Sequence, residues 1–243
     1  MIYKTREGQV SSGEAIGILL LDTSVPFIPG DVANATTYTF PVRFQKIPGF
    51  TVKRALAKDS SVYDQLQLAA KSLERQGVRA ITGDCGYMGI HQQALARVLD
   101  IPVFLSSLIQ LPFIKTIIGP EAKVGVIVAD SESLNDDLLR AVGVSGTANL
   151  VIKGLQDQPN FYRFALKESG VLDTEAVEVE VVAAARQMKA DHAEIQALLL
   201  ECSLLPPYSA AIQAAVNLPV FDYITMINFV FSAVVKQEYR GFM

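Results

Sequence analysis

The sequence predicts an α/β protein made of two pseudosymmetric lobes, each with a mainly parallel sheet flanked by helices. Strand-like and helix-like segments alternate along the chain, and the same order of segments occurs twice. The two cysteines, Cys85 and Cys202, lie at matching points of the repeats, each between a strand-like run and a helix-like run. A proline, Pro102 or Pro219, follows each cysteine at the same distance in the sequence. We therefore expect the two thiols to face each other across an active-site cleft between the lobes.

The first repeat begins with an apolar run, residues 15–21, which is typical of a strand buried on both faces and ends at Asp22. The next stretch, 23–37, is rich in Pro, Gly, Asn and Thr, and its length indicates a binding loop. Pro41 favours an edge position for the following strand, and Gly77 ends the next helix. The elements expected after this loop are a strand at 39–44, a helix at 62–76, a strand at 78–82, a helix at 87–99 and a strand at 101–104.

The second repeat begins with the run 123–130, in which Gly125 and Asp130 have the same spacing as Gly17 and Asp22. Its later elements are expected to be a helix at 134–142, a strand at 149–153, a helix at 174–191, a strand at 194–200, a helix at 207–216 and a strand at 218–221. The linking segment 108–118 is expected to be a helix bent near its proline, and the final helix 224–236 is expected to return to the first lobe. The predicted lobes therefore comprise residues 1–105 with 224–243, and residues 106–223.

Composition excludes several functional classes. Half of the 243 residues are hydrophobic, so the chain can bury a core without disulfides. A net charge of -4 without a basic run argues against nucleic acid as a partner. The start of the sequence lacks the apolar core of a secretory signal, no run is long enough to span a membrane, and the two isolated cysteines form neither a disulfide framework nor a zinc site. These features predict a cytoplasmic protein with reduced thiols and no membrane partner.

The two cysteines indicate proton-transfer chemistry. A thiolate at a helix N-terminus is stabilised by backbone amides, and its pKa can fall to roughly 3.5 to 7.5. The sequence predicts this position for both Cys85 and Cys202. One thiolate removing a proton from carbon, and the opposite thiol giving a proton to the other face, would invert a stereocentre without a cofactor. The alternative is that both are small buried residues, but their matched placement favours catalysis.

Acidic residues stand beside these motifs in both repeats. Asp84 and Glu201 directly precede the cysteines, where they either raise the thiol pKa values or face away and bind loop amides. Asp22 and Asp130 end equivalent strands, where they either contact the substrate or form turns.

Polar residues in the first repeat offer a site for a carboxylate. Asn34, Thr36, Thr37 and Arg43 could bind one through an amide, hydroxyls and a guanidinium group, although they could equally be exposed loop residues and a surface arginine. The two histidines, His91 and His192, are expected on helix surfaces. No run has the spaced glycines of a nucleotide site.

These motifs resemble those of the cofactor-independent aspartate/glutamate racemase superfamily, which includes hydantoin racemases, maleate cis-trans isomerases and arylmalonate decarboxylases. The resemblance extends over most of the chain from Ala15 and rests on Leu-Leu-Asp22-Thr-Ser, Ile-Thr-Gly-Asp-Cys85 and Leu-Glu-Cys202-Ser. It implies a two-lobe fold with one catalytic cysteine from each lobe and with neither pyridoxal phosphate nor a metal.

The residues after the cysteines depart from the superfamily pattern. Gly86 and Tyr87 replace the Asn-Thr of amino-acid racemases, and Ser203 and Leu204 replace Thr-His or Thr-Glu, so a divergent member is expected. The residues expected to bind the substrate are Asp22, Thr23, Asn34, Thr36, Arg43, Gly86, Tyr87 and Ser203.

The leading functional hypothesis is a racemase or epimerase acting at the carbon next to a carboxylate, with an amino acid similar to aspartate or glutamate, or a derivative, as substrate. Cys85 and Cys202 would be the opposed acid and base. The alternatives are a maleate-type isomerase, an arylmalonate-type decarboxylase and a carboxylate-binding protein without activity. The resemblance and the apolar final helix also raise the hypothesis of a homodimer.

Overall fold

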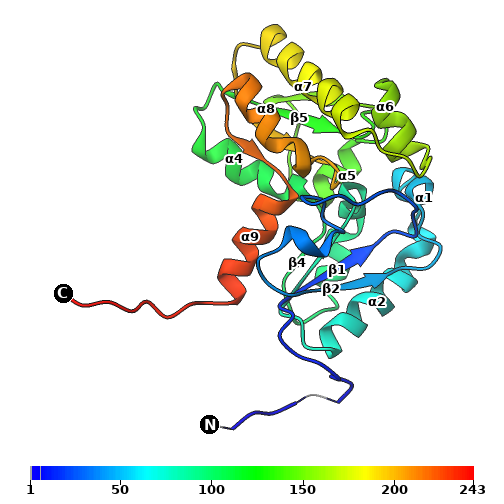
Figure 1. The fold of residues 1–243 in the computed structure, drawn as a ribbon, viewed down its shortest axis with the longest axis vertical. Coiled ribbons are helices and arrows are strands. Elements are labelled where there is room, and N and C mark those ends of the chain that lie inside the picture. Colours follow the sequence, from blue (N-terminus) through cyan, green and yellow to red (C-terminus); the bar gives the residue numbers. More distant parts are fainter. Residues whose placement is uncertain (1, 6) are drawn as a thin grey trace.

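The computed structural model describes residues 2–5 and 7–243, in which two parallel four-stranded sheets form two lobes (Figure 1). The strand order is β2-β1-β3-β4 in the first sheet and β6-β5-β7-β8 in the second. The strands are β1 (Ile16–Leu20), β2 (Val42–Lys46), β3 (Ala80–Gly83), β4 (Val103–Phe104), β5 (Lys123–Val128), β6 (Leu150–Gly154), β7 (Ile195–Leu200) and β8 (Val220–Phe221). Since both sheets have the same topology, the predicted pseudosymmetric α/β fold is confirmed.

Helices flank both sheets (Figure 1). The α-helices are α1 (Val52–Leu56), α2 (Tyr63–Arg75), α3 (Gln92–Ala96), α4 (Leu111–Ile117), α5 (Asp136–Ala141), α6 (Pro159–Phe161), α7 (Thr174–Asp191), α8 (Ser209–Val216) and α9 (Tyr223–Val234). Short 3-10 segments are η1 (Ala35–Thr37), η2 (Ser60–Val62), η3 (Gly86–His91), η4 (Ser107–Gln110) and η6 (Pro206–Tyr208), and η5 (Tyr162–Leu166) is a π-helical turn. No helix in the described ranges has the length and apolar composition needed to cross a membrane.

The first sheet is covered on both faces because β1, one of its two central strands, is apolar at every position. Ile16 and Ile18 of β1 belong to a buried cluster with Tyr223 and Ile227 of α9. Leu19, which points to the opposite face, belongs to the main core together with α2. The packing of α9 on this sheet supports our proposal that the end of the chain belongs with the first lobe.

The helix expected after the first cysteine is broken into two parts. Residues 86–91 form the 3-10 segment η3, and the α-helix α3 is limited to Gln92–Ala96. Glycine is a poor helix former, and here it also permits close packing. A Cβ atom at Gly89 would lie 2.8 Å from Val142 and 2.9 Å from Ser106, so this turn approaches the second lobe closely.

Further segments differ from the sequence prediction, and α1 was not predicted at all. Pro112 does not bend the interior of a helix, since η4 ends just before α4 and the proline lies in the first turn of α4, where its missing N–H costs little. The pair α6 and η5 was not predicted, although Pro159 at the first helical position is a helix start signal.

Equivalent glycines allow one helix to pack closely on each sheet. A Cβ atom at Gly125 in β5 would lie 2.5 Å from both Leu198 and Met188, the latter from α7. At Gly17 in β1 the nearest contact would be 3.0 Å, to Leu73 of α2. The glycine repeat in the sequence therefore reflects packing between helix and sheet.

We expect Gly125→Ala to lower the free energy of unfolding by about 1–3 kcal/mol, the usual cost of overpacking a core. Gly17→Ala should cost less because its closest contact is longer. Urea denaturation followed by circular dichroism measures both. Gly119→Ala is the control, since its new methyl group would meet nothing closer than 3.8 Å. An equal effect at Gly119 and Gly125 would contradict this packing role.

Candidate active site

Both cysteines line one cavity of about 50 Å³, at the carboxyl ends of the strands of both sheets. Cys85 follows β3 and Cys202 follows β7, so each thiol is supplied by a different lobe. The remaining lining is mostly apolar and includes Val25, Phe27 and Leu56. Among the described residues, the lining contains two carboxyl groups and neither Lys, Arg nor His.

The carboxyl groups before the cysteines hold equivalent places in the two lobes. Asp84 Oδ1 accepts a hydrogen bond of 3.0 Å from the Leu21 amide, just beyond β1. Glu201 Oε2 accepts one of 3.2 Å from the Ala129 amide, just beyond β5. The sequence allowed these carboxyls either to bind loop amides or to raise the thiol pKa values. In the structure both carboxyls bind amides, and both also raise the pKa of Cys85.

The residues after the cysteines break this symmetry. Ser203 donates a hydrogen bond to the backbone carbonyl of Asp84 and thereby joins the lobes. Gly86 instead leaves space for the side chain of Glu201, because a Cβ atom there would lie 1.9 Å from Glu201 Oε1. That oxygen is buried and has no hydrogen-bond partner.

Tyr87 and Thr23 also bridge the lobes at the cavity. The Tyr87 hydroxyl donates a 2.5 Å hydrogen bond to the Asp130 carbonyl and accepts a 3.0 Å hydrogen bond from the Asp130 amide. The Thr23 hydroxyl donates to Glu168, which follows the π-helical turn. The same turn places Leu166 in the cavity lining. The hydrogen bond from Thr23 to Glu168 therefore connects this part of the lining to the first lobe.

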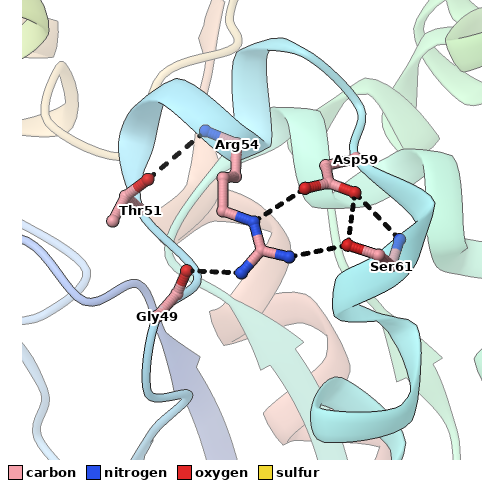
Figure 2. A network of polar contacts seen from close by, with 5 residues as sticks. All are labelled: Gly49, Thr51, Arg54, Asp59 and Ser61. Atoms are coloured by element: carbon pink, nitrogen blue, oxygen red, sulfur yellow. Dashed lines mark hydrogen bonds and ion pairs between the residues drawn. The ribbon is translucent and has the colours of Figure 1, made fainter.

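A network around Arg54 holds the α1 wall of the cavity (Figure 2). The guanidinium group donates to Asp59 at 2.7 Å, to the Gly49 carbonyl at 2.9 Å and to the Ser61 hydroxyl at 2.8 Å. Hydrogen bonds from Ser61 and Arg54 lower the pKa of Asp59 to about 2. Gly49 precedes α1 and Ser61 follows it, so the network holds both ends of the segment that contributes Leu56 to the cavity lining.

The thiols differ from the sequence expectation in their acidity. Burial, together with the nearby carboxyl of Glu201, raises the pKa of both Cys85 and Cys202 well above the ordinary value. Amides of Tyr87 and Met88 oppose this shift at Cys85, and the amide of Leu204 opposes it at Cys202. The predicted low-pKa thiolates at helix N-termini are therefore wrong, because the segments after the cysteines are short turns and the surrounding charges are negative.

The structure brings together six of the predicted site residues and leaves four outside the cavity. Those in the lining are Thr23, Cys85, Gly86, Tyr87, Cys202 and Ser203. Those outside it are Asp22, Asn34, Thr36 and Arg43. Asp84 and Glu201 also line the cavity, although neither was predicted as a substrate contact. Their place directly before the cysteines was the available signal in the sequence.

Each of the four excluded residues has a local structural partner. Asp22 forms a turn, accepting a 2.9 Å hydrogen bond from the Gly49 amide and pairing with Lys46 at 3.1 Å. Asn34 caps η1 by accepting from the amide and hydroxyl of Thr36.

Arg43 lies at the wrong end of the sheet for the cavity. It pairs in register with Gly17, near the amino end of β1, and its guanidinium group binds Glu14 at 2.8 Å. Active sites of parallel sheets lie at the opposite, carboxyl edge.

The two histidines lie outside the cavity lining, and one of them is buried. His91 is packed against the rings of Phe50 and Tyr63, so its predicted surface position is wrong. Burial lowers its pKa. His192 is half-exposed beside Glu194, in agreement with the prediction.

No protein-family model matches the chain. It is similar to a dimethylsulfoniopropionate lyase of Durusdinium sp. clade D, with 33% identity over 222 residues that cover 88% of this chain and 73% of that protein. It is also 33% identical to dimethylsulfoniopropionate lyase 7 of Emiliania huxleyi, over 239 residues that cover 93% of this chain and 69% of that protein.

Solved structures share the fold at low sequence identity. Arylmalonate decarboxylase has a TM-score of 0.57 and 13% identity, covering 93% of this chain and 94% of that one. Glutamate racemase of Bacillus anthracis has a TM-score of 0.57 and 13% identity, covering 92% and 85%. Allantoin racemase of Pseudomonas fluorescens has a TM-score of 0.57 and 16% identity, covering 91% of both. The resemblance to the racemase superfamily is confirmed for the fold.

The buried carboxyls predict that stability falls as pH rises. Burial raises the pKa of Asp31 to about 8, of Glu201 to about 8 and of Asp84 to about 7. Since the unfolded pKa values are about 4, the folded state binds more protons between about pH 4 and these values. Stability from these groups is complete below about pH 4 and is lost by about pH 8, by up to about 1.4 kcal/mol per pH unit for each group.

We expect Asp31→Asn to flatten this fall, since asparagine keeps the acceptor for the Ala33 amide and cannot ionise. Urea denaturation at pH 5 to 8.5 measures the slope. Asp59→Asn is the control, because the pKa of Asp59 is lowered and the carboxyl stays ionised throughout this range. An unchanged slope in Asp31→Asn would contradict the assignment.

Proposed function

Because the chain belongs to the dimethylsulfoniopropionate lyase family, we propose that it eliminates dimethyl sulfide from dimethylsulfoniopropionate and leaves acrylate. The observation that carries the proposal is the 33% identity to a lyase across 88% of this chain. The cavity supports it, since thiols that can act as bases line the same space.

The substrate carries a carboxylate at one end and a dimethylsulfonio cation two carbons away from the carboxyl carbon. A base removes a proton from the carbon next to the carboxylate. The electron pair of the C–H bond forms the C=C bond, the C–S bond breaks, and its electron pair leaves with dimethyl sulfide. This reaction needs one strong base, a contact for the carboxylate and an environment that accepts the cation.

Cys85 is the base in this proposal. Amides of Tyr87 and Met88 oppose the rise in the pKa of its thiol and so favour its thiolate. The burial that raises the pKa of the thiol also makes its thiolate a stronger base. After the elimination the proton on sulfur passes to solvent.

The lining of the cavity can accept the dimethylsulfonio end of this substrate. No basic side chain among its described residues repels the dimethylsulfonio cation. Apolar side chains such as Val25, Phe27 and Leu56 offer contacts for the two methyl groups.

A second candidate is a racemase or epimerase at the carbon next to a carboxylate. The observation that favours it is the presence of two thiols, one from each lobe, in the same cavity. Racemisation uses both as acid and base, whereas elimination uses one. An arylmalonate-type decarboxylase is a related candidate, because the same fold carries that activity elsewhere.

We expect Cys85→Ser to lower kcat/KM for dimethylsulfoniopropionate by about 10²–10⁴, the usual contribution of a general base. Cys202→Ser should lower it by less than about tenfold, because Cys202 takes no proton in the elimination. Gas chromatography of released dimethyl sulfide measures both. Equal large losses would contradict the assignment of one base, and no release by the unmodified protein would reject the lyase.

Deuterium exchange separates the racemase from the lyase. We expect aspartate, glutamate and allantoin to keep their α-hydrogens when incubated with the protein in D₂O, because a lyase for a sulfonium substrate has no activity on them. Proton NMR and chiral chromatography follow the exchange and the inversion. Deuterium entry with loss of optical purity, abolished in both Cys85→Ser and Cys202→Ser, would establish the racemase instead.

A further inference from the structure

Glu201 has a carboxyl oxygen that the fold does not use. The side chain is fully buried, and its Oε2 atom accepts the Ala129 amide at 3.2 Å. Its Oε1 atom has no hydrogen-bond partner, although the residue lines the cavity. Because an unpaired buried polar atom is costly, this oxygen is a candidate contact for a ligand.

Gly86 preserves the space for this oxygen. A Cβ atom at residue 86 would meet three atoms of the Glu201 side chain, the nearest being Oε1 at 1.9 Å. The backbone of Gly86 does not lie in the left-handed region, so its conformation alone does not require glycine. The steric demand of Glu201 therefore accounts for the glycine.

The charge of the cavity decides how Glu201 can meet a substrate. A carboxylate substrate entering it finds no basic side chain among the described lining residues, and it finds a second carboxyl at Asp84. An ionised Glu201 would repel that substrate, whereas a neutral carboxylic acid donates a hydrogen bond to it. Burial raises the pKa of Glu201 to about 8, so the neutral form predominates at neutral pH.

We propose that Glu201 is a catalytic residue that, as a neutral carboxylic acid, donates a hydrogen bond from Oε1 to the carboxylate of the substrate. The inference rests on the proposed function and names the group that receives the carboxylate end. When the thiolate of Cys85 takes the proton from the neighbouring carbon, negative charge collects on the substrate carboxylate. The hydrogen bond stabilises this charge until the C–S bond breaks and dimethyl sulfide leaves with the electron pair. Glu201 keeps its own proton throughout. This reactive form is a minor fraction of the protein, because the pKa of the Cys85 thiol is raised above that of the Glu201 carboxyl.

Several ionisable groups face Glu201. They are Cys85, Cys202 and Tyr87 in the lining, Asp130 beyond β5, Tyr223 at the start of α9, and Asp84 through its effect on Cys85. Burial raises the pKa of Asp84 to about 7, so this carboxyl also titrates in the useful range. A comparison of variants at Glu201 alone separates its titration from the others.

The first experiment uses Glu201→Gln and Glu201→Met. Glutamine keeps a donor at this position, so kcat/KM for dimethylsulfoniopropionate should stay within about tenfold of the unmodified protein. Methionine has no donor, so kcat/KM should fall by about 10²–10³, the usual effect of losing one such hydrogen bond. If Gln costs as much as Met, the charged form is the active one and the proposal is wrong. If Met keeps full activity, the residue is structural.

The second experiment measures binding without turnover. Ligand-observed NMR gives the Kd of propionate between pH 6.5 and 9. We expect the Kd of the unmodified protein to rise at least threefold as pH passes 8, and that rise to be absent in Glu201→Gln. Glu180→Gln is the matched control, since Glu180 is a buried carboxyl that binds the amides of Asn160 and Phe161 outside the cavity. The same loss of pH dependence in this control would overturn the proposal.

Gly86→Ala tests the contact while Glu201 stays in place. The new methyl group should displace Oε1, weaken propionate binding at pH 6.5 by at least tenfold and leave the melting temperature within a few degrees. In a Glu201→Ala background the same change should alter binding by less than threefold, and a full tenfold effect there would contradict the contact. Binding of propionate that depends on Glu201, in a protein that releases no dimethyl sulfide, would reject the lyase and retain the carboxylate contact.

Discussion

The structure depends on two buried carboxyl groups that hold the ends of the central strands. Asp84 receives the amide of Leu21, and Glu201 receives the amide of Ala129, so each cysteine turn is fixed to the neighbouring strand of its own sheet. These amides lie beyond the strand ends, where the ladder no longer pairs them. The serine after Cys202 then joins one turn to the other. The relative position of the two thiols follows from these few hydrogen bonds.

The same carboxyls determine the acidity of the site. They lie close to the thiols in a space without basic groups among its described residues, so burial and negative charge raise the pKa of Cys85. A thiol of this kind is rarely ionised at neutral pH, but its thiolate is a stronger base than an ordinary one. A hydrogen next to a carboxylate is weakly acidic, and its removal demands such a base. The structural role of the carboxyls therefore supports the proposed chemistry.

Sequence patterns predicted the fold because buried strands, glycine positions and the cysteine repeat are local features. The matched runs around Gly17 and Gly125 reflect close packing between a helix and the sheet in both lobes. The predicted residues that lie in the cavity lining are Thr23, just after the first strand, and the two cysteines with the residues directly after them.

The rest of the site depends on contacts between distant segments. Arg43 has the chemistry of a carboxylate contact, but the register of β2 places it near the amino end of its sheet. The π-helical turn that supplies Leu166 lies far along the chain from the cysteines and carries no motif. Local sequence does not contain the register of a strand or the closure of a loop from the other lobe.

The departure from symmetry is as informative as the symmetry. A two-base racemase treats both faces of a carbon alike, so its two walls need matching acid and base groups. Here Glu201 lies against Gly86, and its Oε1 atom has no hydrogen-bond partner. The shorter Asp84 lies against Ser203, whose hydroxyl donates to the backbone carbonyl of Asp84. The two walls therefore differ in side-chain length and in the hydrogen-bonding atoms left for a substrate. An elimination has one base and one leaving group, and it gains nothing from equal walls. The unequal walls therefore favour a reaction that proceeds from one side of the substrate, as expected for a lyase built on a racemase fold.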